Sequence, residues 1–377
     1  MQKALSVFGT RPEVIKLAPV IKQLEAHSRF QSVACATGQH KEMMKQMLQV
    51  FEIEPGYDLE VMEEDQSLTG LTGRILSGVD DVIECESPDI VLVQGDTTTA
   101  FTTALAAFYN KVPVGHVEAG LRTGKKYDPF PEELNRVLAD SLSELYFAPT
   151  EENKDNLLKE GVPEAAIYVT GNPVIDALFY ILDREKDSGV DENFPLDFPS
   201  NLSEGRFLIL VTAHRRESFG RNLSEICRAL RKIAARYPSA TILYPVHLNP
   251  NVARIVKEIL GEVKNVKLTA PLSYTSFVKA MQLARVILTD SGGIQEEAPS
   301  LGKPVLVMRN TTERPEAVKA GTVKLVGTDS ERIVAETARL LDDPDAYSQM
   351  AGIINPYGQG DSAERIVEIL DHYFHSE

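Results

Sequence analysis

A segment near residue 290 combines residue types that bind anions. The apolar run Val286–Leu288 predicts a buried strand, and the residues after it turn directly into a helix. The turn consists of Ser291, Gly292 and Gly293. Two glycines let backbone N–H groups converge, and a helix N-terminus adds partial positive charge, so such a turn is typical of a phosphate site. On this segment alone, an ordinary tight turn between a strand and a helix explains the residues as well.

Charged residues extend this hypothesis. Glu296 and Glu297 follow the turn by one to two helical turns, where a carboxylate can bind a diol such as a ribose. The chain has a net charge of −16, so an anion site must gather its cations locally. The candidate cations stand beside sharp turns and are Arg11, Lys16, His214, Arg215, Arg216 and Arg314.

Three carboxylates in the first half of the chain are candidates for acid–base chemistry. Asp96, Glu118 and Glu132 each lie at or near the expected end of a strand. Converging carboxylates can shift one another's pKa and divide the roles of acid and base. Glu118 precedes Ala119-Gly120, which suits a tight turn. Glu132 is also explained as an ordinary first-turn acid that the helix dipole favours.

Histidines also follow the expected strands. His214 precedes two arginines, which favours a role in binding or protonating an anionic leaving group, and His247 occupies a similar place. His116 lies two residues before Glu118, so both side chains of an extended segment would point the same way. A hydrogen-bonded structural histidine explains His116 equally well. No metal-ligand spacing and no dinucleotide or Walker motif occurs, so we expect neither metal nor cofactor.

Alternating strand and helix patterns must position these residues. Apolar runs predict strands, and apolar residues at helical spacing follow them. The expected strands are 3–8, 89–93, 112–117, 144–148 and 167–170, then 206–212, 241–245, 285–289 and 304–308. Repeated β-α units predict parallel sheets covered on both faces. Ligands bind such sheets beyond the carboxyl ends of the strands, and six polar clusters fall at these ends.

The alternation breaks once, over residues 181–204. This stretch is polar, contains prolines and carries scattered charge, so it is typical of a linker. We therefore predict an N-terminal α/β domain over 1–180 with the candidate carboxylates, and a C-terminal α/β domain over 205–360 with the anion-binding turn. Both are expected to be doubly wound, Rossmann-like domains, and we expect them to face each other across a cleft.

Composition limits the class of protein. The chain has 377 residues, 43% of them hydrophobic, which is enough for two domains with separate cores. It has neither a long apolar run nor a signal-peptide pattern, so we expect a cytoplasmic protein without membrane contact. No basic stripe is visible, which argues against a nucleic-acid partner. We interpret Cys35, Cys85 and Cys227 as small core residues in apolar settings.

Ten blocks of sequence, in order from residue 3 to about 370, resemble one known family. They read GTRPEVIKLAPVI, QGDTTTA, HVEAGLRT, PFPEELNR, GNPVIDAL, TAHRRES, YPVHLNPNV, DSGGIQEEAPSLGKPVL, TTERPEAV and NPYGQGDSAERI. The chain is similar throughout to the bacterial non-hydrolysing UDP-N-acetylglucosamine 2-epimerases. The resemblance implies a GT-B fold, a C-terminal helix within 361–377 that crosses back to the first domain, and a homodimer.

The resemblance also implies a reaction. UDP-N-acetylglucosamine (UDP-GlcNAc) would lose UDP to give 2-acetamidoglucal, and re-addition would give UDP-N-acetylmannosamine (UDP-ManNAc), a unit for cell-surface polysaccharides. No cofactor is implied. The implied catalytic residues are Asp96, Glu118, Glu132 and His214. The implied UDP-binding residues are Arg11, Lys16, Arg215, Leu272, Phe277, Ser291, Gly292, Gly293, Glu297 and Arg314.

Other readings share much of this pattern. A GT-B glycosyltransferase with the same donor would have the same diphosphate turn, but would need an acceptor pocket where the carboxylates stand. A hydrolysing epimerase would release free ManNAc and UDP. A catalytically silent nucleotide-sugar sensor would be expected to lack at least one of Asp96, Glu118, Glu132 and His214, and all four are present.

Resemblance to Gram-positive members of the family, which a second UDP-GlcNAc activates, raises the hypothesis of an allosteric site. The residues concerned are Gln39, His40, Gln46 and Arg74. An ordinary polar turn and helix surface explains these residues equally well.

Overall fold

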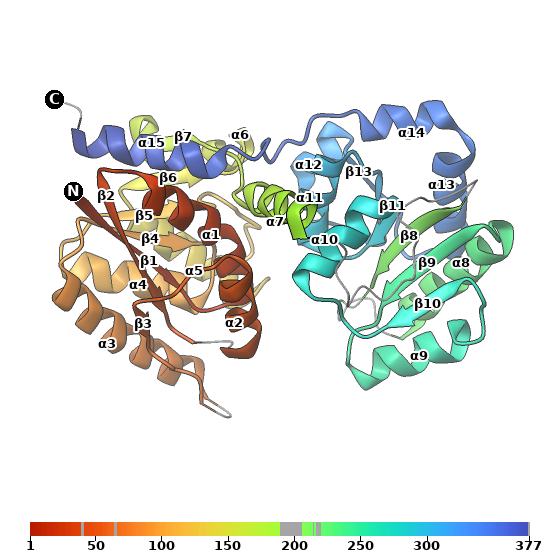
Figure 1. The fold of residues 1–377 in the computed structure, drawn as a ribbon, viewed down its shortest axis with the longest axis horizontal. Helices are drawn as coiled ribbons and strands as arrows, with labels where there is room; N and C mark the ends of the chain where they lie inside the picture. Colours follow the sequence, from red (N-terminus) through yellow and green to blue (C-terminus); the bar gives the residue numbers. More distant parts are fainter. Residues whose placement is uncertain (39–40, 64–65, 189–205, 214, 216–219, 376–377) are drawn as a thin grey trace. The chain divides into compact units, whose positions relative to one another are not determined.

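The chain forms two compact units in the computed structural model (Figure 1). The structure describes residues 1–38, 41–63, 66–188, 206–213, 215 and 220–375. The first unit comprises 1–179 and 357–377, and the second comprises 180–356. Each unit is a Rossmann-like domain built on one parallel sheet, as the sequence predicts.

The sheet of the first unit has the strand order β3-β2-β1-β4-β5-β6-β7, and all its pairs are parallel. Its strands are β1 (Gln2–Phe8), β2 (Phe30–Ala36), β3 (Tyr57–Asp58), β4 (Ile90–Gln94), β5 (Val114–Val117), β6 (Leu145–Ala148) and β7 (Ile167–Val169). Both faces of β4 and β5 are buried, and this explains their continuous apolar sequences.

Helices cover this sheet and connect its strands. They are α1 (Arg11–Ala26), α2 (Lys41–Val50), α3 (Leu68–Glu86), α4 (Thr98–Tyr109), α5 (Glu132–Ser141), α6 (Glu151–Lys159), α7 (Val174–Ser188) and α15 (Ser362–His375), with a 3-10 turn at Glu164–Ala166. Helices α3 and α4 bury one face of the sheet, where Leu5, Val33 and Val91 form part of the core. The C-terminal helix α15 packs against α1, and Arg29 binds Asp371 at 2.9 Å (Figure 1).

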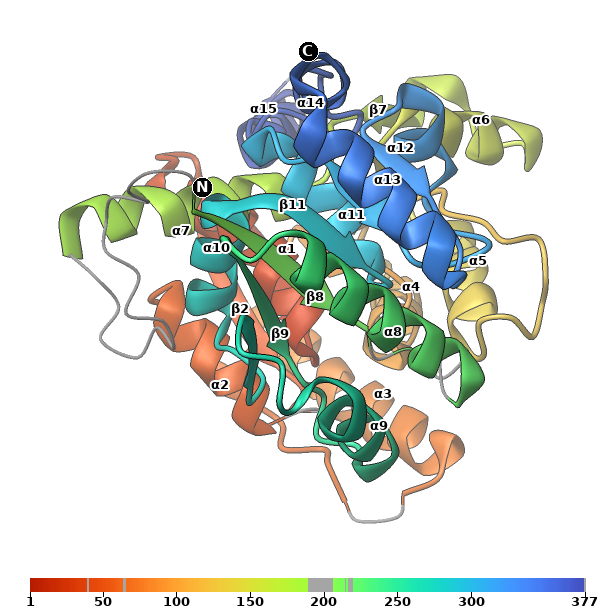
Figure 2. The ribbon, with the colours of Figure 1, turned by 90° about the vertical axis from the view of Figure 1, so that its right-hand side faces the viewer.

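The second unit repeats this design with the strand order β10-β9-β8-β11-β12-β13. Its strands are β8 (Phe207–Thr212), β9 (Ala240–Pro245), β10 (Val266–Thr269), β11 (Ala284–Thr289), β12 (Val305–Val307) and β13 (Val323–Leu325). Its helices are α8 (Arg221–Arg236), α9 (Pro250–Leu260), α10 (Tyr274–Leu283), α11 (Gly292–Glu297), α12 (Pro315–Ala320), α13 (Ser330–Asp342) and α14 (Pro344–Ala351), with a 3-10 turn at Ala298–Leu301. Figure 2 shows α8 and α13 side by side along this sheet, and their apolar faces share its core.

Both sheets reverse their winding direction at one place. In the first unit the order reverses between β1 and β4, and in the second between β8 and β11. Ligands of open α/β sheets bind at such switch points, beyond the carboxyl ends of the strands. The turns that follow these four strands hold Arg11, Asp96, Arg215 and Ser291. The topology thus places many of the candidate residues at the expected edge of each sheet.

Some details differ from the sequence expectations. Helix α7 continues to Ser188, inside the range 181–204 that we assigned to a linker. Leu182 is buried, and the polar residues that follow, such as Arg184, Glu185 and Lys186, have good helix propensity. Residues 189–204 lie outside the described part. The last segment of the first unit begins at Tyr357, before the range 361–377. Cys35 and Cys227 are buried, but Cys85 is exposed near the end of α3. The expectation of a core position for Cys85 was therefore wrong.

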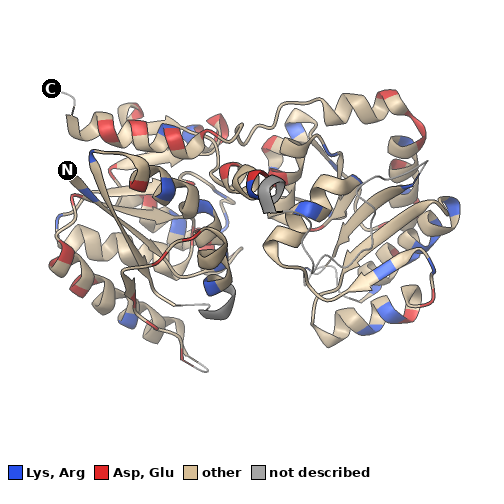
Figure 3. Ribbon diagram, viewed as in Figure 1, with Lys and Arg blue, Asp and Glu red and all other residues tan. Residues whose placement is uncertain are grey.

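Figure 3 shows both signs of charge spread over the helices of each unit, and no continuous basic stripe is visible among the coloured residues. None of the described helices combines the length and the apolarity that a bilayer span requires.

Candidate active site

Glu118 lies at the centre of the polar network beyond β5. Its carboxylate accepts hydrogen bonds from Lys16 of α1, from Gln94 at the end of β4 and from Asn172 after β7, the last at 3.0 Å. Glu118 has φ 69°, a left-handed conformation that is uncommon outside glycine and often marks functional sites. These three donors fix a buried carboxylate in one orientation at the carboxyl edge of the sheet.

The turn after Glu118 requires glycine. Gly120 has φ 83°, and a Cβ at this position would lie 2.3 Å from the carbonyl oxygen of Asn153. Its N–H donates to Asp140 of α5 at 3.2 Å. The sequence expectation of a tight turn after Glu118 is therefore confirmed, and the tightness comes from the approach of α6.

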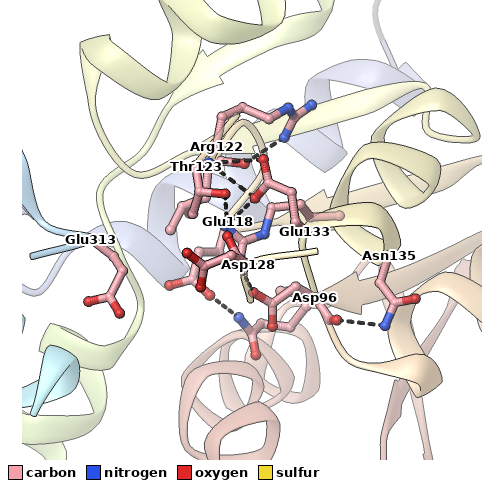
Figure 4. A network of polar contacts seen from close by, with 12 residues as sticks. Asp96, Glu118, Arg122, Thr123, Asp128, Glu133, Asn135 and Glu313 are labelled. Atoms are coloured by element: carbon pink, nitrogen blue, oxygen red, sulfur yellow. Dashed lines mark hydrogen bonds and ion pairs between the residues drawn. The ribbon is translucent and has the colours of Figure 1, made fainter. Parts of the chain in front are cut away.

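Asp96 stands in the neighbouring turn, between β4 and α4. Its carboxylate pairs with Arg136 of α5, and its backbone carbonyl accepts a 3.0 Å hydrogen bond from Asn135 (Figure 4). Thr97 caps α4 by accepting from the N–H of Ala100, which fixes the start of the helix directly after Asp96. Asp96 is thus anchored at both its side chain and its backbone.

Helix α5 presents one face to these turns. Glu132, Arg136 and Asp140 follow one another at intervals of four residues, so they lie along one side of the helix. Since Arg136 binds Asp96 and Asp140 binds the Gly120 N–H, this side faces the strand ends. Glu132 is half-buried one turn before Arg136, and its carboxylate makes no hydrogen bond or ion pair within the described part of the chain.

The neighbouring Glu133 has a structural role instead. Its carboxylate accepts from the N–H groups of Thr123 and Gly124 at 2.8–3.0 Å and pairs with Arg136 at 3.2 Å (Figure 4). Glu133 therefore holds the loop that precedes α5. Both acids lie in the first turn of α5, where the helix dipole favours a carboxylate, as the sequence offered for Glu132.

Glu13 closes the turn between β1 and α1. Its carboxylate accepts from the N–H groups of Gly9 at 3.0 Å and Thr10 at 2.7 Å, and from the Thr97 hydroxyl at 2.6 Å. Burial raises the pKa of Glu13 to about 7, although these hydrogen bonds act in the opposite direction. Glu13 joins the two turns at the switch point, next to Arg11 and one helical turn before Lys16. Sequence reasoning missed this residue, although a glutamate three positions after a threonine cap is a capping-box pattern.

In the second unit, Arg215 occupies the turn after β8. Its N–H donates to Asp290 at 2.8 Å, and its guanidinium binds Glu313 at 3.0 Å. Arg309 binds the same Glu313 at 2.7 Å. Burial opposes ionisation of Glu313, but Arg309 and Arg215 lower its pKa to about 2. A fixed cation therefore stands beside the end of β11.

The predicted anion-binding turn follows β11 as expected. Ser291 is the N-cap of α11, and none of the described side chains caps this helix. A Cβ built on Gly292 would lie 3.5 Å from the Arg215 guanidinium, so the turn and this cation are neighbours. Arg314 pairs with the buried Glu296, which gives Glu296 a structural role, and Gly293 lies close to the buried Glu297.

The remaining candidates are spread more widely. Leu272 precedes α10 and Phe277 lies on it, and both are half-buried. Gln46 is exposed on α2, and Arg74 of α3 binds Glu63 at 2.8 Å and the carbonyl of Val61 at 3.1 Å. His214, Arg216, Gln39 and His40 lie outside the described residues. Among the described residues, no group of three or more His, Cys, Asp and Glu side chains is arranged to hold a metal ion.

The structure thus gathers candidates within each unit. In the first unit Lys16 binds Glu118, and the turn that carries Asp96 contacts Glu118 through Gly95. Arg11 and Glu132 begin the helices α1 and α5. Arg215, Ser291, Gly292, Gly293 and Glu297 gather at the second switch point. Gln94, Asn172 and Arg136 were missed as individual residues, although each lies inside or beside a motif that the sequence analysis singled out.

Comparison with known proteins identifies the family. The family model "UDP-N-acetylglucosamine 2-epimerase" matches residues 22–371. The UDP-N-acetylglucosamine 2-epimerase of Salmonella typhimurium is 54% identical over 376 residues, covering 98% of this chain and 99% of its own. The Escherichia coli K12 enzyme of the same name is 54% identical over 373 residues, with 98% of each chain covered.

Solved structures agree with these sequence matches. The crystal structure of UDP-GlcNAc 2-epimerase from Neisseria meningitidis bound to UDP-GlcNAc has a TM-score of 0.89 at 50% identity, covering 98% of this chain and 99% of that one. A Listeria monocytogenes structure with the same family name, given there as putative, has a TM-score of 0.92 at 43% identity and covers 100% and 97%. The class of fold is GT-B, with two Rossmann-like domains. The chain belongs to the UDP-N-acetylglucosamine 2-epimerase family.

Proposed function

We propose that this epimerase is of the non-hydrolysing type and interconverts UDP-GlcNAc and UDP-ManNAc. The intermediates are UDP and 2-acetamidoglucal, and both stay bound in the site between the two steps. In elimination, the bond between C1 and the UDP oxygen breaks, the C2 proton leaves, and a C1–C2 double bond forms. In re-addition, the UDP oxygen bonds to C1 and a proton enters C2 from the opposite face. The net reaction is redox-neutral, so we expect no cofactor.

The observation that carries this proposal is the gathering of Asp96, Glu118 and Glu132 at one sheet edge. A C2 proton is barely acidic while UDP remains attached, and it becomes acidic as the C1–O bond breaks and positive charge develops at the ring. Several carboxylates around the ring then stabilise that charge and move the proton between the two faces. Glu132 has no partner among the described residues, so it is the best placed of the three to exchange a proton.

The leaving group needs a separate binding site, which we place at the second switch point. In the first unit, the N–H groups of Gly9 and Thr10 already donate to Glu13. An anion at that turn would therefore bind its side chains and not these backbone groups. In the second unit, α11 carries no described side-chain cap, and Arg215 stands beside Gly292. We therefore assign the UDP diphosphate to Ser291, Gly292, Gly293 and Arg215, with help from Arg314 and, from the sequence resemblance, Arg11 and His214.

The rest of the nucleotide follows from the same placement. Glu297 on α11 would bind the ribose hydroxyls, and Leu272 with Phe277 would contact the base. Lys16 would support the sugar side of the site through Glu118. The same proposal includes a homodimer in the cytoplasm that supplies ManNAc units for cell-surface polysaccharides. It also includes activation by a second UDP-GlcNAc, which would bind at Gln39, His40, Gln46 and Arg74.

One experiment tests the reaction type. The enzyme is incubated with UDP-GlcNAc in D2O, and NMR follows UDP-ManNAc, free ManNAc and deuterium at C2. We expect UDP-ManNAc with deuterium at C2, and C2 exchange into the remaining UDP-GlcNAc as the reaction reverses. Accumulation of free ManNAc and UDP would show a hydrolysing enzyme, and sugar transfer only after an acceptor is added would show a glycosyltransferase. Either outcome would overturn the proposal.

A further inference from the structure

His116 lies beneath the candidate active site, and both of its ring nitrogens face acceptors. Nδ1 lies 2.6 Å from the Asp140 carboxylate, and Nε2 lies 2.8 Å from the carbonyl oxygen of Gly95. A carbonyl oxygen can only accept, so Nε2 must carry a proton. The side chain is fully buried, so solvent offers neither nitrogen another partner.

Asp140 is held in its ionised form by other donors. Its second oxygen accepts from Arg122 at 2.7 Å and from the N–H of Gly120 at 3.2 Å. An ionised carboxylate leaves the proton of the short hydrogen bond on Nδ1 of His116. Both ring nitrogens then carry protons, which is the imidazolium form.

This buried pair joins the two turns that carry the candidate carboxylates. His116 holds the carbonyl of Gly95, the residue immediately before Asp96. Asp140 holds the N–H of Gly120, which lies two residues after Glu118. The turns also touch directly, because a Cβ on Gly95 would lie 3.3 Å from Glu118 Oε2. A shift of either turn would therefore move both carboxylates relative to each other.

We propose that His116 is a permanently charged positioning residue, whose imidazolium and its partner Asp140 fix the spacing of Asp96 and Glu118. His116 is not a proton donor to the substrate in this assignment. The inference rests on the proposed roles of Asp96 and Glu118, and it adds the device that sets their geometry. A displacement of about 1 Å in such groups is enough to cost roughly 100-fold in rate.

The surrounding charges favour the imidazolium. Burial disfavours it, but the charge of Asp140, their hydrogen bond and the Gly95 carbonyl together raise the pKa of His116. Burial likewise opposes ionisation of Asp140, and His116 with Arg122 lowers its pKa. The other titratable groups nearby are Glu160, which pairs with Arg122 at 2.6 Å, Tyr146 on β6, and Glu118 with its partner Lys16.

The protonation state can be read directly on the wild-type enzyme. We would label histidine with 15N and titrate the protein without substrate from pH 6 to pH 9. The His116 signal is assigned by its absence from His116→Gln, since the chain has seven histidines. We expect imidazolium shifts for His116 throughout, because the Asp140 carboxylate and the Gly95 carbonyl each accept from one ring nitrogen. A neutral ring at pH 8 would overturn the proposal whatever the variants do.

Kinetics test the positioning role. His116→Gln keeps an N–H donor but loses the charge, and we expect kcat to fall about 100-fold. KM for UDP-GlcNAc should change by less than about threefold, because the lost geometry acts on the transition state rather than on nucleotide binding. In His116→Gln the Asp140 carboxylate keeps Arg122 and the Gly120 N–H as donors, so we expect this variant to fold.

Asn265 provides the matched control. Its amide donates to the carbonyls of Ala234, Tyr237 and Ala240 at 3.0–3.2 Å, which is a similar tie between side chain and backbone before β10. Asn265→Ala should lower the melting temperature and leave kcat per folded molecule unchanged. A folded His116→Gln with wild-type kcat would overturn the positioning role. Wild-type C2 exchange in both Asp96→Asn and Glu118→Gln would instead refute the proposed function and leave the imidazolium result standing.

Discussion

At the scale of single residues, the three candidate carboxylates differ sharply in how they are held. Glu118 accepts from Lys16, Gln94 and Asn172, whereas Glu132 has no partner within the described chain. Asp96 pairs with Arg136. A group with fixed donors is suited to stabilising charge, and an unpaired one is suited to exchanging a proton, because no hydrogen bond must be broken first.

This difference gives the first prediction. Replacing each carboxylate by its amide should lower turnover by roughly two to four decades, the usual range for a positioned acid or base. Glu132→Gln should keep the wild-type melting temperature, since no described bond is lost. Glu118→Gln should also lower the melting temperature, because its new NH2 group would face donors. Turnover, C2 exchange and melting are measured on the same samples. Near-normal exchange in all three variants would mean that the catalytic assignment is wrong.

The second prediction concerns Arg314 and the diphosphate. Arg314→Ala should weaken UDP binding by about 1.5–3 kcal/mol, the contribution of a hydrogen bond to a charged group. This single change also leaves Glu296, whose side chain is 2% exposed, without its cation. The informative variant is therefore Arg314→Ala/Glu296→Gln, which removes the buried charge as well. Calorimetry that gives wild-type UDP affinity for this double variant would exclude Arg314 from the clamp.

At the scale of elements, two crossing segments of the first unit are tied together beside the site. The N–H of Asn172, whose side chain also binds Glu118, donates to the carbonyl of Tyr357 at 2.7 Å. One turn further along α7, Asp176 accepts from the N–H of Ala363 at 2.8 Å and so caps the start of α15. The chain therefore returns to the first unit beside the helix through which it left, and this joint adjoins Glu118.

The third prediction is a pH dependence of this joint. Burial raises the pKa of Asp176 from 3.8 to about 6. The unfolded chain ionises this carboxyl first, so its contribution to stability is complete below pH 4 and is lost as the pH rises through 6. Asp176→Asn cannot ionise, so its free energy of unfolding relative to wild type should rise by about 2 kcal/mol between pH 4 and pH 7.

Melting curves across this pH range check the dependence. Asp155→Asn, on an exposed position of α6, is the matched control and should show a constant difference from wild type. If the difference in stability between Asp176→Asn and wild type were also constant with pH, burial would not shift the pKa of this carboxyl group.

At the scale of the whole molecule, the proposed chemistry needs both units. The carboxylates lie in the first unit and the anion-binding turn lies in the second. The proposal therefore requires that one substrate contacts both units during the reaction. Many enzymes with two domains exclude water by closing one domain on the other around the ligand.

The fourth prediction is that UDP-GlcNAc reduces the radius of gyration measured by solution scattering. UDP alone should have a smaller effect, since it lacks the sugar that reaches the carboxylates. Glu297→Gln, which would weaken ribose binding, should need more ligand for the same change. Identical profiles with and without UDP-GlcNAc at saturation would argue against closure.

The sequence by itself determined the alternation of strands and helices, the parallel sheets and the placing of polar clusters at strand ends. Apolar runs such as 286–288 and the glycines after them carry this information locally, within a few residues. Strands β2, β10 and β13 did not stand out, because their apolar runs are short or interrupted by polar residues such as Gln31, Lys267 and Lys324. Motif resemblance supplied the family, and the comparisons confirmed it.

Only the tertiary structure decided which polar side chains bind each other. Glu118 and Lys16 are 102 residues apart in sequence, and His116 and Asp140 are 24 apart, so no local pattern announces either pair. The same holds for the adjacent acids Glu132 and Glu133. Glu133 is bound to a loop, whereas Glu132 has no partner among the residues that the structure describes. Partners of this kind arise because parallel strands bring distant turns to one edge of a sheet, and burial there makes each polar group find a specific partner.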